Sequence, residues 1–126
     1  MIVTVSLFVF SALTSIVILF QLGLAAGMPW GAASMGGKYP GKYPLNMRVV
    51  AGINALVLAG MIVIAWARAG RLFPELESIA SVGIWVLVVF FGIATLMNTI
   101  TPSKIERIWA PVAFGQMVTS LIVAMT

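Results

Sequence analysis

The sequence predicts an all-α membrane protein: an up-and-down bundle of four transmembrane helices, with an irregular loop between the first two. Three observations predict this class. Of the 126 residues, 62% are hydrophobic and only 8% are charged, whereas soluble domains carry about 25% charged residues. The mean hydropathy is +1.15. Finally, four apolar stretches are each long enough to cross a hydrocarbon core of about 30 Å as a helix.

The four helices are expected at about residues 2–26, 47–67, 76–100 and 105–125, within one membrane domain covering residues 1–126. Helices are required because lipid offers no partner for an unpaired backbone amide. Runs such as IWVLVVFFGIATLM also lack the alternation of a barrel strand. The first stretch is expected to be a retained span rather than a signal peptide, because no Lys or Arg precedes it and its apolar run is too long.

Local signals indicate where the later helices begin. Pro74 suits a first helical turn, where the acids Glu75 and Glu77 are favoured by the helix dipole. The segment SKIE at 103–106 matches a capping box that opens the fourth helix. Pro111 would then lie inside that helix and bend it near its entry.

The first loop, residues 27–46, contains the tetrapeptide GKYP twice in tandem, at 37–40 and 41–44. Its glycines and prolines prevent a continuous helix. Lysine and tyrosine side chains favour the lipid headgroup region, so the loop is expected to anchor the first two helices at the membrane surface. Whether it lies flat at the interface or re-enters the membrane stays open, as do binding of an anionic lipid or ligand and docking of a partner protein.

The third loop and the start of the fourth helix hold the other candidate contacts. Glu106 and Arg107 are expected to cap the helix and meet headgroups. The alternative is that they pair with Arg48 and with carbonyls of the first loop, which would tie the two loops together. The full set of candidate lipid, ligand or partner contacts is Lys38, Tyr39, Lys42, Tyr43, Arg48, Glu106 and Arg107.

Small residues at four-residue spacing predict close helix packing of the GxxxG type. The first row is Gly23, Gly27 and Gly31, and the second is Ala51, Ala55 and Ala59. Packing within the bundle is the expected role, and contact with another protein is the alternative.

Four polar residues fall within the apolar spans, namely Gln21, Asn54, Asn98 and Gln116. Polar groups at membrane depth turn toward the bundle interior and find partners there. Hydrogen bonds between helices are therefore expected, and a polar path for a small solute is the alternative.

The distribution of cations predicts the orientation. The first and third loops share one side of an up-and-down bundle and carry five cations, whereas the second loop carries two. The positive-inside rule then places the first and third loops in the cytoplasm and both termini outside. The net charge of +4 does not indicate nucleic-acid binding, because the cations lie at the ends of apolar spans. Anionic lipid headgroups are the expected contacts of these cations.

The chain contains no cysteine and no histidine. Disulfides, thiol chemistry, imidazole catalysis and His-ligated zinc or haem are therefore excluded. No catalytic motif is present, so the protein is expected not to be an enzyme and to carry neither cofactor nor metal.

Two four-span families of similar length do not fit. Small multidrug antiporters need a carboxylate within the first helix, which has none here, and small fluoride channels carry signatures of which Asn54 and Phe90-Phe91 are only an echo. The chain resembles a set of uncharacterised small four-helix bacterial membrane proteins in its segments MPWGAASMGGKYPGKYPLNMR and ITPSKIERIWAPV. The resemblance covers nearly the whole chain. It implies a bacterial inner-membrane protein and no particular activity.

The sequence therefore predicts a small polytopic membrane protein without catalytic chemistry, acting as a membrane subunit or as an assembly partner of another protein or of further copies of itself. The alternative is an oligomeric channel or facilitator for a small neutral or anionic solute. Proton-coupled transport is disfavoured because no carboxylate or imidazole lies at membrane depth.

Overall fold

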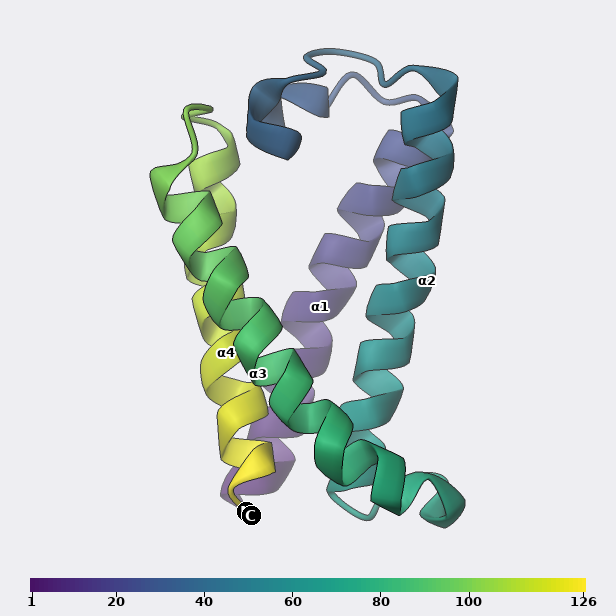
Figure 1. Ribbon diagram of the computed structural model, residues 1–126, viewed down its shortest axis with the longest axis vertical. Helices are drawn as coiled ribbons and strands as arrows, with labels where there is room; N and C mark the ends of the chain where they lie inside the picture. The colour runs from purple at the N-terminus through teal and green to yellow at the C-terminus, as the bar shows by residue number, and fades with distance from the viewer.

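The computed structural model describes residues 1–126 and contains only helices and their connections (Figure 1). The long helices are α1 (Ile2–Ala26), α2 (Leu45–Arg68), α3 (Glu77–Ile100) and α4 (Trp109–Ala124), and the short 3-10 helices are η1 (Gly31–Ala33), η2 (Met35–Gly37), η3 (Pro74–Leu76) and η4 (Glu106–Ile108). The four long segments, with η3 and η4 included, are long and apolar enough to cross a membrane. The predicted four-helix membrane bundle is confirmed.

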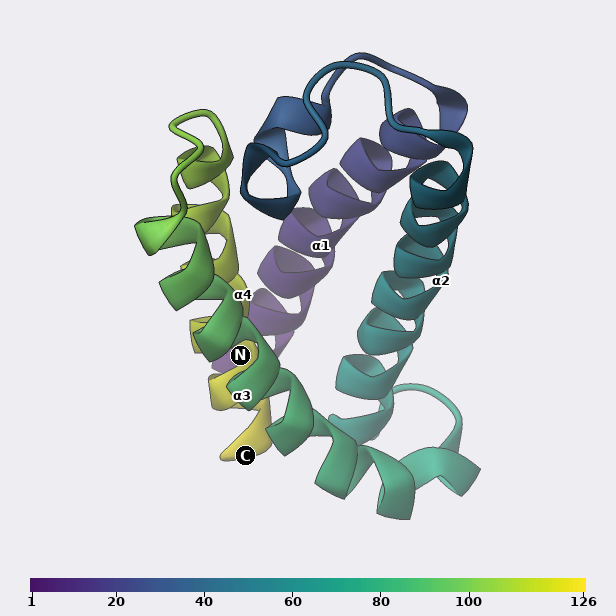
Figure 2. The same ribbon diagram turned by 45° about the horizontal axis from the view of Figure 1, so that its top comes forward.

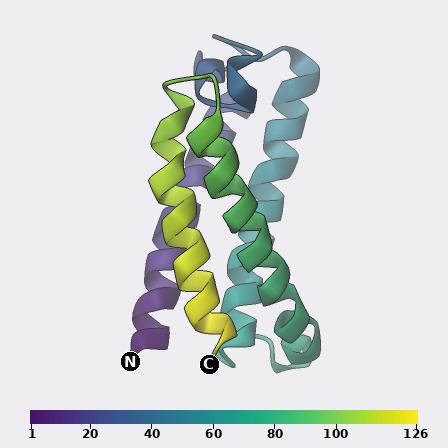
Figure 3. The same cartoon turned by 60° about the vertical axis from the view of Figure 1, so that its left-hand side comes forward.

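The bundle consists of two antiparallel hairpins, α1 with α2 and α3 with α4, joined along α1 and α4. At the opposite side of the bundle, α2 and α3 lie together near the connection between them and then diverge, as Figures 1 and 2 show. Both termini lie at the end where α2 and α3 meet (Figure 3). The end that carries loop one (residues 27–44) and loop three (residues 101–105) is therefore open between α2 and α3.

A hydrophobic core closes the end that holds the termini. All four helices contribute to it, through Leu7, Phe10, Ala65, Ile84, Leu87, Phe91, Val123 and Ala124. At its centre the rings of Phe10 and Phe91 pack edge to face, with centroids 5.6 Å apart. Edge-to-face packing is the favoured geometry for aromatic pairs, and here it joins the two hairpins.

A smaller cluster holds loop one against the end of α1. It consists of Leu24, Tyr43, Met47 and Ala51. Tyr43 is only 4% exposed, which corrects the expectation that both tyrosines of the tandem repeat lie at headgroup level. The ring of Tyr39 packs edge to face on Tyr43, with centroids 5.8 Å apart. The repeat therefore buries its second tyrosine and uses the first to cover it.

The glycines at four-residue spacing do not form one helix face, so this prediction is wrong for Gly27 and Gly31. Helix α1 ends at Ala26 because Gly27 adopts a left-handed conformation (φ 95°) that ends the helix. Gly31 lies in η1, where its N–H donates to the carbonyl oxygen of Gly41 at 2.9 Å. Gly23 does lie on α1, but the ring of Trp30 occupies the space that its side chain would fill. These glycines fold loop one back onto its own helix.

The alanine row on α2 is used only in part. Ala51 and Ala55 are 1% and 5% exposed, whereas Ala59 faces outward. Helix α2 packs mainly along α1, and each four-residue step turns the row by about 40° around the helix, so Ala59 has left the packed face.

The start of α4 also differs from the prediction. The helix begins at Trp109 rather than near residue 105, because the one-turn η4 precedes it. Pro111 therefore lies in the first turn of α4, where its missing N–H costs nothing, and the expected bend has no cause. Only half of the capping box forms, since Ser103 accepts a long bond of 3.4 Å from the N–H of Glu106 while the Glu106 carboxylate bonds elsewhere. Pro74 begins η3 and leads into α3 as expected.

Candidate functional site

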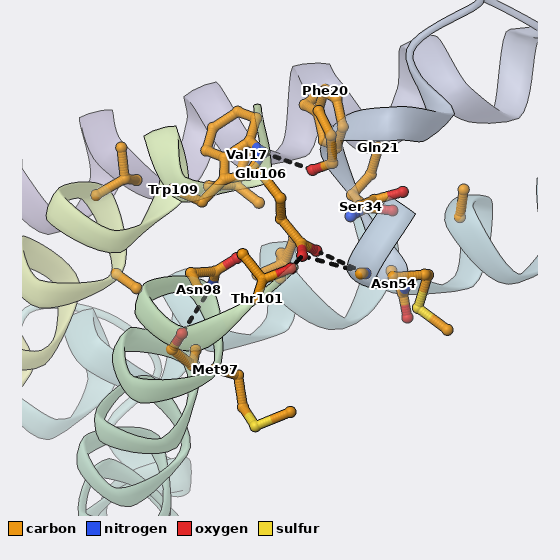
Figure 4. Close-up of a pocket in the computed structure, with 18 of the residues that line it drawn as sticks. Val17, Phe20, Gln21, Ser34, Asn54, Met97, Asn98, Thr101, Glu106 and Trp109 are labelled. Atoms are coloured by element: carbon orange, nitrogen blue, oxygen red, sulfur yellow. Dashed lines mark hydrogen bonds between the residues drawn. The ribbon is translucent and has the colours of Figure 1, made fainter. Parts of the chain in front are cut away.

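A cavity of about 880 Å³ occupies the space where α2 and α3 diverge. We call it the lateral cavity, because these two membrane-spanning helices supply most of its exposed lining residues, which places its mouth between them. Figure 4 shows side chains that line it. Of its 29 lining residues, 20 are hydrophobic. The helix α2 contributes Val50, Ala51, Asn54, Val57, Leu58 and Met61, and α3 contributes Phe90, Phe91, Ile93, Ala94, Met97 and Asn98. Several apolar residues near the mouth are more than half exposed, among them Val57, Ile93 and Met97, so the opening faces the hydrocarbon.

All four intramembrane polar residues line this cavity. Gln116 is 3% exposed and donates to the hydroxyl of Thr14 at 2.9 Å, which is the only one of the expected interhelical bonds. Asn98 donates to the carbonyl oxygen of Ala94 in its own helix at 2.8 Å. The amides of Gln21 and Asn54 make no hydrogen bond to the other residues drawn in Figure 4; Gln21 is half-buried and Asn54 is exposed. These two amides at membrane depth are therefore free to form hydrogen bonds with a molecule in the cavity.

The polar groups occupy one half of the bundle. Counted along the helices at 1.5 Å per residue, Gln21 lies roughly 8 Å from the end of α1 and Asn54 roughly 14 Å from the start of α2. The hydrophobic core fills the other half. The lateral cavity thus has a polar upper part beneath loop one and an apolar floor.

Loop one forms the roof of the cavity, and residues of loop three and the start of α4 hold it in place. The carboxylate of Glu106 accepts the N–H of Gly36 at 3.1 and 3.3 Å and also the hydroxyl of Thr101. The Ser103 hydroxyl donates to the carbonyl oxygen of Ala32. The indole of Trp109 donates to the carbonyl oxygen of Ala33 at 3.0 Å. The roof spans the end of the bundle, from α1 and α2 to the α3–α4 hairpin, to which it is tied (Figures 2 and 4).

The two loops are therefore tied together, but not through the partners expected from the sequence. Arg48 donates to the carbonyl oxygen of Ala25 at 2.9 Å and completes the end of α1. Arg107 donates to the carbonyl oxygen of Thr101 at 3.0 and 3.1 Å. Glu106 is left to accept the amide of Gly36, since both arginines are occupied by carbonyls.

The cations of loop one do not reach the cavity. Lys38 and Lys42 are exposed, and the ammonium of Lys38 lies 5.5 Å from the ring centroid of Tyr39. No lysine or arginine lines the cavity, and Glu106 is its only charged residue. The predicted contact set thus separates into an outer group of cations, the two tyrosines that hold the loop, and one carboxylate that faces inward.

Several residues of the site escaped sequence reasoning. Gly36, Thr101 and Trp109 hold the roof, and Ser34 bonds to the hydroxyl of Tyr43 beneath it. The pair Gly36-Gly37 in the sequence could have indicated a tight turn here, because glycine adopts positive φ values at little cost. In the structure the two φ values are 66° and 75°.

The fold and the site define a small polytopic integral membrane protein whose four-helix bundle encloses a laterally open cavity under a tied loop. Comparison with protein-family models, with curated proteins and with solved structures gave no match. The resemblance to small bacterial membrane proteins stays a prediction, and the function has to be argued from the cavity.

Proposed function

We propose that this protein binds an amphiphilic molecule that diffuses within the bilayer. The observation that carries the proposal is the lateral cavity: its mouth lies between two membrane-spanning helices, its lining is mostly apolar, and its polar groups gather beneath one roof. A ligand would enter sideways from the lipid with its apolar part against Phe90 and Met97. Its polar end would lie near Gln21 and Asn54.

The volume favours a small molecule over a helix of a partner protein. A membrane-spanning helix of about 10 Å diameter and 30 Å length occupies about 2,400 Å³. Small-molecule sites measure about 300–1,000 Å³, and the lateral cavity measures about 880 Å³. A partner helix or a second copy of the chain seated against the mouth is the competing occupant.

The geometry does not favour the alternative of a channel through one chain. A continuous polar path would have to pass the core at the end of the termini, where Leu7, Phe10 and Ile84 have no exposed surface. The four polar residues instead line a cavity that opens sideways and is blocked by this core toward the termini, which suits binding better than permeation.

We propose the role of a non-catalytic membrane subunit, which holds the amphiphile for an interaction partner. In the proposed orientation, loops one and three are cytoplasmic and the lateral cavity lies in the cytoplasmic half of a bacterial inner membrane. The exposed cations of loop one would then meet anionic headgroups outside the cavity.

Native mass spectrometry of the protein extracted from its own membranes tests the binding. We expect a co-purifying amphiphile that is lost when the cavity is filled by Ala94→Phe, because Ala94 lines the cavity on α3. The matched control is Ala59→Phe, which adds the same side chain on the exposed face of α2 outside the cavity. Equal retention by both variants would refute the proposal, and a bound protein chain lost only from Ala94→Phe would assign the cavity to a partner.

Single-cysteine labelling tests the orientation, since the chain contains no cysteine. Pro40→Cys in loop one and Leu72→Cys between α2 and α3 place thiols at exposed positions and leave every cation in place. We expect an impermeant maleimide to label Pro40→Cys only in inside-out vesicles and Leu72→Cys only in intact spheroplasts. The reverse pattern would contradict the cytoplasmic placement of loops one and three.

A further inference from the structure

The charges around the lateral cavity restrict the charge that the polar end of its ligand can carry. Only Glu106 among the lining residues is charged. The nearby arginines do not line the cavity and are engaged on backbone carbonyls, Arg48 on Ala25 and Arg107 on Thr101. An anionic headgroup would therefore enter a space of low dielectric constant that offers it one like charge and no opposite charge.

The remaining polar groups suit a hydroxyl. The amides of Gln21 and Asn54 each offer both a donor and an acceptor and make no hydrogen bond to the other residues drawn in Figure 4. They lie roughly 8 and 14 Å from the nearest ends of their helices, deeper than the headgroup level at which charged lipid groups are hydrated. A hydroxyl can donate to the oxygen or accept from the nitrogen of either amide without bringing a charge to that depth.

The carboxylate does not need a cation from the ligand. Glu106 already accepts the N–H of Gly36 and the hydroxyl of Thr101, so hydrogen bonds stabilise its negative charge. A cationic head would have to compete with these two donors, which also hold the roof.

We infer that the lateral cavity selects an amphiphile with an uncharged, hydroxyl-bearing polar end and rejects anionic phospholipids. The inference rests on the proposed function and narrows its ligand class. Glu106 disfavours the anion, and the amides of Gln21 and Asn54 offer bonds to the hydroxyl.

A series of lipids with identical acyl chains tests the inference by native mass spectrometry in detergent at equal mole fraction. The series is diacylglycerol, which has a free hydroxyl, phosphatidic acid, and the analogue in which trimethylammonium replaces the hydroxyl. We expect diacylglycerol adducts to exceed those of the other two at least tenfold and to disappear in Ala94→Phe. Preferred binding of phosphatidic acid or of the trimethylammonium lipid, abolished by Ala94→Phe, would overturn the inference and leave the proposed function intact. Adducts that persist unchanged in Ala94→Phe would overturn both the inference and the proposed function.

Two further variants separate the polar groups from the shape of the cavity. The double variant Gln21→Leu with Asn54→Leu breaks no bond within the protein, and we expect it to lower diacylglycerol adducts at least fivefold. The control Thr99→Val removes an exposed hydroxyl outside the cavity and is expected to change nothing. Glu106→Gln keeps an acceptor for Gly36 and removes the charge, so it is expected to raise the phosphatidic acid to diacylglycerol ratio. An unchanged ratio would show that Glu106 does not set the discrimination.

Discussion

Replacing Gly31 by alanine is expected to open loop one locally while the four helices stay folded. The added methyl group would overlap the carbonyl oxygen of Tyr39 and lie 2.7 Å from the carbonyl oxygen of Gly41. Both are backbone atoms, so no change of rotamer relieves the clash, and the bond from Gly31 to Gly41 is lost. Overpacking of this kind costs about 3 kcal/mol, which corresponds to about a 100-fold faster amide exchange across residues 31–43.

Hydrogen-exchange mass spectrometry in detergent measures this effect directly. The matched control is Gly52→Ala on α2, where the added methyl group meets no atom within 4 Å. That variant is expected to stabilise α2 by up to about 1 kcal/mol, because alanine favours the helix more than glycine does. Unchanged protection of loop one in Gly31→Ala would contradict the close approach of η1 to the tandem repeat.

Glu106→Ala is expected to release the roof from the α3–α4 hairpin. The N–H of Gly36 and the hydroxyl of Thr101 would both lose their acceptor. Hydrogen bonds to a charged group contribute about 1.5–3 kcal/mol, so exchange in loop one should rise by about 10- to 100-fold. If the proposed amphiphile is held beneath this roof, its dissociation should accelerate by a similar factor.

Two further variants serve as controls for this prediction. Glu106→Gln keeps one neutral acceptor and should give an intermediate effect. Glu75→Ala removes an exposed carboxylate at the other end of the bundle and should leave loop one unchanged. A roof that stays protected in Glu106→Ala would mean that the bonds of Ser103 and Trp109 hold it without the carboxylate.

The number of helices and the extent of the first were predictable because hydrophobicity and length act locally. A run of apolar residues needs no information about its neighbours to enter lipid as a helix. The start of α4 was missed because SKIE matches a capping box, whereas the chain forms a separate turn there. The glycine row was misread for a related reason. The same four-residue spacing serves a helix face or, as Gly27 and Gly31 show, a chain that leaves the helix and returns.

The sequence by itself determined that lipid rather than water surrounds this protein, that four helices cross the membrane, and which polar residues lie within these helices. Only the tertiary structure decided that Gln21, Asn54 and Glu106, from different helices and far apart in the chain, face one cavity. It also decided that the two identical tetrapeptides differ, since Tyr43 is buried whereas Tyr39 is only half-buried. The physical reason is that the cavity arises from the divergence of two hairpins. That divergence depends on side chains such as Phe10 and Phe91, which meet only after the chain has folded.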